Sequence, residues 1–301
     1  MTTILRSLLA LSLLLASAAA QAAVNVLACE PEWADLASRL GGDRVRVSSA
    51  TTGLQDPHHV EARPSLIART RNADLLVCTG MELEAGWLPA LVEQSGNSRV
   101  APGRPGLFEA GRFVVPLEVP AQVDRSQGDV HAQGNPHIHL DPRNVARVAD
   151  ALARRLGEID PDGASAYGTR HQAFAAQWAD AQRRWLEQGA ELKGVALVEH
   201  HRNLSYLANW LGMRIEGSLE PKPGIEPSAA HLNALLKSLD QRPIRLVAHM
   251  TYQDARAAQW LGTNAHVPVV ALPLTIGGTD KAKDLFSLYD EILARLREAV
   301  R

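Results

Sequence analysis

Short apolar runs rich in β-branched residues alternate along most of the chain with longer amphipathic stretches. This alternation is typical of parallel sheets that are covered by helices on both faces. We expect strands at Val24–Ala28, Val45–Ser49, Leu75–Val77, Phe113–Leu117, Val195–Val198, Arg214–Ser218, Ile244–Ala248 and Val267–Leu272. The expected helices are Trp33–Leu40, Pro64–Arg71, Leu83–Glu93, Val145–Leu156, Leu204–Leu211, Ala229–Leu239, Asp254–Leu261 and Leu285–Ala299. The pattern therefore predicts an α/β protein of two lobes, each a parallel four-stranded sheet flanked by helices.

A different pattern separates the two halves. Apolar residues recur at steps of three and four from Tyr167 to Trp185, which predicts one long helix. About 28 residues without a proline span roughly 40 Å, at 1.5 Å per residue. This helix is either one more packing helix or a rigid backbone between two lobes. We divide the chain into an N-terminal metal-binding lobe (23–160), a linking helix (161–192) and a C-terminal metal-binding lobe (193–301).

The first 22 residues have the pattern of a secretory signal peptide. Arg6 is their only charge, an apolar run covers Ser7–Leu15, and Ala20-Gln21-Ala22 fits a cleavage site. The apolar run is shorter than the roughly 20 residues of a membrane-spanning helix. We expect cleavage near Ala22 and, because no lipobox cysteine follows, a soluble mature protein that is free in the periplasm.

Composition narrows the function further. The 301 residues are 46% hydrophobic and carry 31 Lys+Arg against 33 Asp+Glu, a formal net charge of −2. This balance argues against a dedicated nucleic-acid binder, which is usually basic. The two cysteines, Cys29 and Cys78, each follow an expected strand. If those strands are parallel neighbours, a Cys29–Cys78 disulfide is feasible in an exported protein, and two buried free thiols are the alternative.

Candidate metal ligands gather where the expected strands end. They are His58, His137, His200, His201, His249 and Asp280. Ligands of open α/β sheets bind at the carboxyl ends of the strands. Neutral imidazole is a good zinc ligand, and three histidines with one carboxylate complete a tetrahedral site. The pattern therefore indicates a metal site to which both halves of the chain contribute ligands.

Longer motifs surround these histidines. They are Asp56-Pro57-His58-His59-Val60-Glu61 with Pro64-Ser65, Ala73-Asp74-Leu75 with Gly80-Met81-Glu82-Leu83-Glu84, Asn135-Pro136-His137-Ile138-His139-Leu140-Asp141-Pro142, and His201 followed by Tyr206. With the long middle helix, they resemble the periplasmic receptors of zinc and manganese ABC importers, the cluster A-I solute-binding proteins. The resemblance covers nearly the whole mature chain.

The resemblance implies four ligands, namely His58, His137, His201 and Asp280. The spacing to Tyr206 selects His201 over His200, and His249 is the main rival of Asp280. Manganese receptors of the family usually carry glutamate at the third position, so a histidine there favours Zn²⁺ over Mn²⁺. The resemblance also implies an inner-membrane ABC permease as partner and lobes that move little on binding.

The chain also departs from the family. Where many zinc receptors carry a long histidine-rich loop, residues 120–134 hold a single histidine, His131. This segment is either a loop that delivers His131, a docking site for a metallochaperone, or a disordered surface loop, which we favour. His139 replaces the family's usual aromatic residue and either supports a ligand or is exposed. For the remaining histidines we expect positions outside the ligand set (His59, His200), in the core (His171) and on the surface (His231, His266).

A shell filled by four protein ligands favours a carrier over an enzyme, because a catalytic zinc keeps one position for water. We expect a monomeric receptor that captures Zn²⁺ between its lobes and delivers it to an ABC importer, with Asp280 as the first ligand to yield. The main alternative is a secreted zinc-dependent hydrolase, because His137-x-His139-x-Asp141 is similar to a metallo-β-lactamase run. Pro142, however, stands where that run continues with histidine. A lobed adhesin with a structural zinc is a further alternative.

Overall fold

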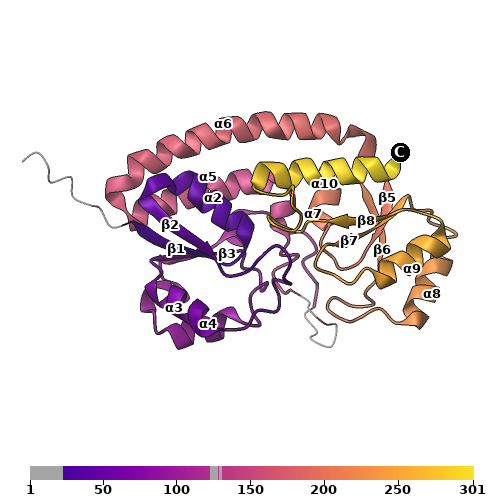
Figure 1. Cartoon of the computed structure of the whole chain (residues 1–301), viewed down its shortest axis with the longest axis horizontal. Coiled ribbons are helices and arrows are strands. Elements are labelled where there is room, and N and C mark those ends of the chain that lie inside the picture. Colours follow the sequence, from indigo (N-terminus) through magenta and orange to yellow (C-terminus); the bar gives the residue numbers. More distant parts are fainter. Residues whose placement is uncertain (1–22, 123–127, 129–130) are drawn as a thin grey trace, which may run out of the picture.

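The computed structural model describes residues 23–122, 128 and 131–301 (Figure 1). The expected signal peptide lies outside the described residues. Within the described part of the chain, no helix combines the length and the apolar character needed to cross a membrane.

Two parallel sheets form the centres of two lobes. The first contains β1 (Val24–Ala28), β2 (Val45–Ser49), β3 (Leu75–Cys78) and β4 (Leu107–Glu109) in the order β2-β1-β3-β4. The second contains β5 (Ala196–Glu199), β6 (Arg214–Ser218), β7 (Leu246–Met250) and β8 (Val269–Leu272) in the order β6-β5-β7-β8. The two orders are equivalent, and they confirm the predicted fold class.

The helices begin and end at residues suited to those positions. Their bounds are α2 Pro31–Gly41, α3 Pro64–Asn72, α4 Leu88–Ser95, α5 Pro142–Ile159, α6 Ala164–Gln188, α7 Ser205–Leu211, α8 Ala229–Ser238, α9 Arg256–Ala265 and α10 Leu285–Val300. Proline begins α2, α3 and α5, where its missing N–H needs no partner. Gly96 and Gly212 end α4 and α7 in the left-handed conformation that glycine adopts readily.

Two predicted elements of the N-terminal lobe are wrong. The fourth strand is Leu107–Glu109 and not Phe113–Leu117, because Phe113 ends a 3-10 turn and Val115 is 73% exposed. The helix predicted from Leu83 begins only at Leu88. A turn after β3 intervenes, in which Met81 and Glu82 adopt positive φ angles.

Helix α6 lies along one side of both lobes (Figure 1). Its apolar stripe is buried from Tyr167 to Trp185, except that His171 is only half-buried and not in the core as expected. Trp185 stacks on Tyr289 of α10, with ring centroids 4.6 Å apart. One continuous apolar cluster includes Val26 of the first sheet and Leu197 of the second. We therefore propose that α6 is the rigid backbone between lobes 23–160 and 193–301.

The two cysteines lie at the carboxyl ends of neighbouring strands. Cys29 follows β1, Cys78 ends β3, and β1 pairs directly with β3. A disulfide joins them across a Cα–Cα distance of 4.7 Å, and both residues are fully buried. The predicted bridge is confirmed, and it closes this edge of the N-terminal sheet.

Candidate metal centre

Three histidines from separate segments meet between the lobes. His58 lies in the loop between β2 and α3, His137 precedes the 3-10 turn that leads to α5, and His201 follows β5. One ring nitrogen from each histidine takes part, and these three nitrogens all lie within 4.8 Å of one another. The residues are only 7%, 1% and 6% exposed, respectively. We call these three residues the histidine triad.

Each ring of the triad is held by a neighbouring polar side chain. Nδ1 of His58 lies 2.8 Å from Oδ1 of Asp56, and Nδ1 of His201 lies 2.7 Å from Oε2 of Glu220. The side-chain amide nitrogen (Nδ2) of Asn203 lies 3.1 Å from Nε2 of His137. Such partners orient metal-binding imidazoles, and carboxylates also make them more basic.

Buried nitrogens of the triad lack partners. Nε2 of His58 and Nδ1 of His137 have no hydrogen-bond partner among the described residues. Buried polar atoms without partners are rare in proteins, and each requires an explanation. Imidazole nitrogens that converge in this way are suited to a divalent cation.

The protonation states of the site fit metal binding. Burial, together with repulsion from His58 and His201, lowers the pKa of His137 well below its ordinary value. Neutral imidazole, which is the metal-binding form, is therefore favoured at pH 7. Burial opposes ionisation of Asp56, but the hydrogen bond and charge of His58 outweigh it and lower the pKa of Asp56 to about 2. The site thus pairs a neutral His137 ring with an ionised carboxylate behind His58.

The motifs around the triad fix its loops. The Trp87 indole donates to the carbonyl of Pro57 at 2.9 Å, directly before His58. The Tyr206 hydroxyl donates to the carbonyl of Asn135 at 3.0 Å and accepts from the backbone N–H of Leu117 at 3.0 Å. Tyr206 therefore links the segment that carries His137 to the helix that follows His201.

The expected fourth ligand lies apart from the triad. Asp280 is exposed and is not part of the converging group found among the described residues, so its role as a ligand stays a prediction. His249 is buried, with Nδ1 2.9 Å from the carbonyl of Met250, and is also outside that group.

Four other histidines lie outside the triad. His59 is exposed, while His200 is buried with Nε2 3.8 Å from Glu220. His266 is exposed, as its predicted surface position requires. His231 is half-buried, with its Nε2 3.0 Å from the carbonyl of Ser218, and so lies partly at the surface.

His139 occupies a different place from either of its predicted ones. It is buried, its Nε2 lies 2.9 Å from the carbonyl of Leu274, and its Nδ1 lies 3.1 Å from Oε1 of Glu32. The contacts of both ring nitrogens are thus with residues outside the triad. His137 and His139 are therefore not placed to hold one ion in the manner of the hydrolase run.

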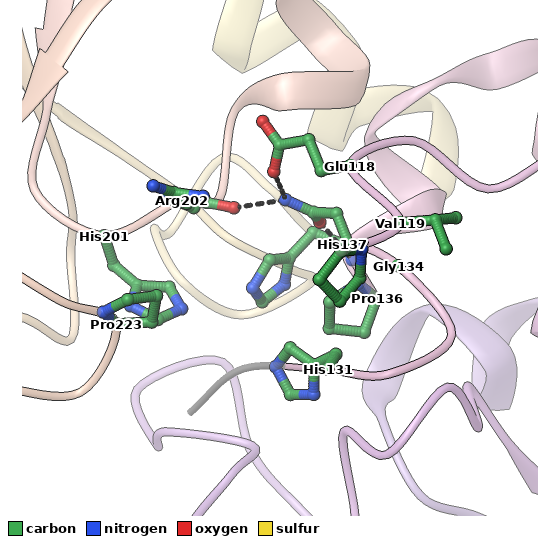
Figure 2. Close-up of a pocket in the computed structure, with 11 residues that line it drawn as sticks. Glu118, Val119, His131, Gly134, Pro136, His137, His201, Arg202 and Pro223 are labelled. Carbon is green, nitrogen blue, oxygen red and sulfur yellow. Dashed lines mark hydrogen bonds between the residues drawn. The ribbon is translucent and has the colours of Figure 1, made fainter. Parts of the chain in front are cut away.

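His131 is the residue that sequence reasoning placed least well. It lines a pocket of about 240 Å³ together with His137 and His201 (Figure 2). Its ring stacks on that of His58 with centroids 5.3 Å apart. His131 itself thus lies beside the triad, while residues 123–127 and 129–130 of the same segment lie outside the described residues, so the expectation for the loop as a whole stays a prediction. The available signal was its position, as the lone histidine in the segment where related receptors concentrate them.

Solved structures share this architecture. A crystal structure of ZnuA aligns with a TM-score of 0.78 and 23% identity over 93% of this chain and 100% of that one. A Mn-bound periplasmic metal binding protein from Candidatus Liberibacter asiaticus aligns with a TM-score of 0.75 and 16% identity over 92% and 100% of the two chains. At these identities the alignments establish the fold.

Sequence comparisons extend the likeness to metal receptors. The lipoprotein ScbA of Streptococcus cristatus, a metal ABC transporter substrate-binding protein, is 21% identical over 88% of this chain and 84% of its own. The high-affinity zinc uptake protein ZnuA of Yersinia pestis is 24% identical over 61% of each chain. The profile of the family described as zinc-uptake complex component A, periplasmic, matches residues 26–299. The chain therefore belongs to this family of ABC-importer substrate-binding proteins.

Proposed function

We propose that this chain is a periplasmic receptor that binds Zn²⁺ at the histidine triad and delivers it to an ABC importer. The observation that carries the proposal is the convergence of three buried imidazoles from both lobes, within 4.8 Å of one another. The metal is the cargo of the protein, so tight capture and later release are both part of the function.

The donor set supports zinc over manganese. Imidazole nitrogen suits Zn²⁺, whereas Mn²⁺ prefers oxygen ligands. The carboxylates of Asp56 and Glu220 contact imidazole nitrogens of the triad and add negative charge behind them. This charge stabilises a divalent cation without adding oxygen ligands.

The proposed partners follow from the family. An inner-membrane permease receives the metal, and a periplasmic metallochaperone is a candidate donor. We propose that the receptor acts as a monomer, free in the periplasm after cleavage near Ala22. Because metal binding requires deprotonated imidazole, acid weakens capture and favours release.

Titration of the metal-stripped protein tests this function. We expect one tightly bound Zn²⁺ per chain and weaker Mn²⁺ binding in competition with a chromophoric chelator. His58→Ala and His137→Ala each weaken zinc binding strongly, while the control His266→Ala leaves it unchanged because His266 is exposed. Native affinity in both triad variants would refute the proposed site.

A further inference from the structure

The segment between β8 and α10, residues 273–284, carries Asp280, the predicted fourth ligand. Its first three residues are buried, whereas Asp280 is exposed. The backbone N–H of Gly277 donates to the carbonyl of Ala282 at 2.7 Å, so the part that contains Asp280 is a short turn whose two ends are joined. We call residues 277–282 the Asp280 turn.

Two buried side chains of the N-terminal lobe hold the start of this segment. Nε2 of His139 lies 2.9 Å from the carbonyl oxygen of Leu274, and because a carbonyl only accepts, the ring nitrogen donates. The Thr275 hydroxyl donates to Oε2 of Glu32 in α2. His139, Glu32 and Thr275 are only 2%, 1% and 5% exposed, respectively. Nδ1 of His139 lies 3.1 Å from Oε1 of Glu32, so one buried cluster joins α2, the turn after His137 and the segment after β8.

Helix α2 also holds the end of the segment. The Arg39 guanidinium donates to Oδ2 of Asp284 at 2.8 Å, and Oδ2 of Asp35 accepts from the backbone N–H of Leu285 at 3.2 Å. Glu32, Asp35 and Arg39 follow one another at steps of three and four, so they share one face of α2. Figure 1 shows this helix beside the start of α10. Both ends of the segment are thus attached to a helix of the N-terminal lobe.

The loop that carries His58 contacts the Asp280 turn directly. Gly53 lies in this loop, between β2 and α3, and is buried. A Cβ at Gly53 would lie only 2.3 Å from the carbonyl carbon of Gly277 and from the backbone nitrogen of Gly278. No side chain fits at that distance, so the close approach of the two backbones requires glycine. The turn therefore packs against the loop of a triad histidine.

We propose that Glu32 and His139 are positioning residues of the metal centre, which fix the Asp280 turn to the N-terminal lobe. This inference rests on the proposed function and on the prediction that Asp280 is a ligand. Because Asp280 is exposed, ligation requires the tip of the turn to move toward the triad while its ends stay fixed. Fixed ends leave less conformational freedom to lose on binding, and this preorganisation strengthens metal binding. Asp280 then moves with the N-terminal lobe, and His201 is the ligand on the other lobe.

A double-mutant cycle in the whole mature protein tests the inference. His139→Leu removes the donor to the carbonyl of Leu274, and Thr275→Val removes the hydroxyl that Glu32 accepts. We expect each substitution to weaken zinc binding by about tenfold in chelator competition. Neither should weaken it further in an Asp280→Ala background, because no carboxylate remains to be positioned. A merely structural role would instead lower the affinity equally in both backgrounds.

Two further variants serve as controls. Thr275→Ser keeps the hydroxyl and should keep the native zinc affinity. Glu291→Gln alters a carboxylate that is also buried but contacts Arg295 of its own helix at 2.6 Å, and it should keep the native affinity too. Urea unfolding of each variant establishes that binding is measured on folded protein. His139→Leu completes the cycle by itself should Thr275→Val fail to fold.

The outcomes separate this inference from the proposed function. Native zinc affinity in His139→Leu and Thr275→Val, or an equal loss with and without the Asp280 carboxylate, would overturn the positioning role. Native affinity in Asp280→Ala would overturn it as well, because the turn would then carry no ligand. These results leave the triad intact, whereas native affinity in variants of the triad itself would remove the proposed function.

Discussion

The two lobes share one strand order but use the carboxyl ends of their central strands differently. In the N-terminal sheet, the Cys29–Cys78 disulfide closes the ends of β1 and β3. In the C-terminal sheet, β5 leads through His200 into His201, and this edge opens onto the candidate metal centre. The ends of the central strands therefore stabilise one lobe and lead into a triad histidine in the other, while the N-terminal lobe contributes His58 and His137 from other segments.

Both lobes nevertheless bury a carboxyl group at this edge. Glu84 accepts from the N–H of Thr79, and burial raises its pKa to about 7. Glu199 accepts from the N–H of Leu204 at 2.8 Å, and burial raises its pKa to about 8. In each lobe the carboxyl group shapes the turn after a central strand. The lobes differ in the residues that this turn carries.

The largest expected effect comes from removing the ligand at the open edge. His201→Ala should weaken zinc binding by about a thousandfold or more, roughly 4 kcal/mol, because a triad member is lost. Chelator competition measures the affinity, and His200→Ala is the matched control from the same strand end. An equal loss in both variants would contradict the different roles assigned to the two histidines.

Opening the closed edge should affect stability and not binding. The double substitution of Cys29 and Cys78 by alanine removes a bridge that closes a chain segment with a sequence separation of 49. We expect the free energy of unfolding in urea to fall by about 2–4 kcal/mol, with zinc affinity retained. Loss of zinc binding without loss of stability would show that this edge contributes directly to the metal centre.

The carboxylates behind the triad should have a smaller effect on affinity. Asp56→Asn and Glu220→Gln should each weaken zinc binding by roughly 10–100-fold, because the rings lose their orientation and basicity. Glu61→Gln provides the control, since Glu61 lies in the loop of His58 with its side chain 88% exposed. Zinc affinities equal to that of the control variant would contradict the orienting role that we assign to these carboxylates.

The smallest expected effect is a pH dependence of stability. Between the ordinary glutamate pKa and about 8, folded Glu199 keeps a proton that the unfolded chain releases. The contribution of Glu199 to the free energy of unfolding of the metal-stripped protein should therefore fall as pH rises from 5 to 8. Glu199→Gln should remove this contribution, because glutamine does not titrate.

Urea unfolding at several pH values provides the measurement. Glu84 lies in the other lobe and keeps its own contribution to the slope, because its pKa is also raised. An unchanged slope in Glu199→Gln would show that Glu199 keeps an ordinary pKa in the folded chain.

Much of the fold was predictable because periodicity is a local property. The stripe from Tyr167 to Trp185 indicated the long helix, and the apolar runs located seven of the eight strands found among the described residues. The exception, β4, is the three-residue strand Leu107–Glu109, which is too short for a period to show. The nearby apolar residue Phe113 instead stacks on Phe108, with ring centroids 5.0 Å apart.

The histidine contacts were harder to predict because they depend on residues distant in sequence. Strand ends and motifs were sufficient to bring the triad together as a hypothesis. The place of His131 depends on Glu82, and the burial of His139 depends on Glu32 and Leu274. Patterns in a single sequence do not reveal contacts between residues that are distant in the chain. The positions of these two residues could therefore be found only from the structure.

The apolar cluster that includes both Val26 and Leu197 has a consequence for how the protein melts. Two domains with separate interiors often denature in two steps, but an interior common to both sheets couples their unfolding. We therefore expect one calorimetric transition for the whole molecule. Zinc bound at the histidine triad should raise the temperature of that single transition, since a ligand of the folded state stabilises everything that unfolds with its site.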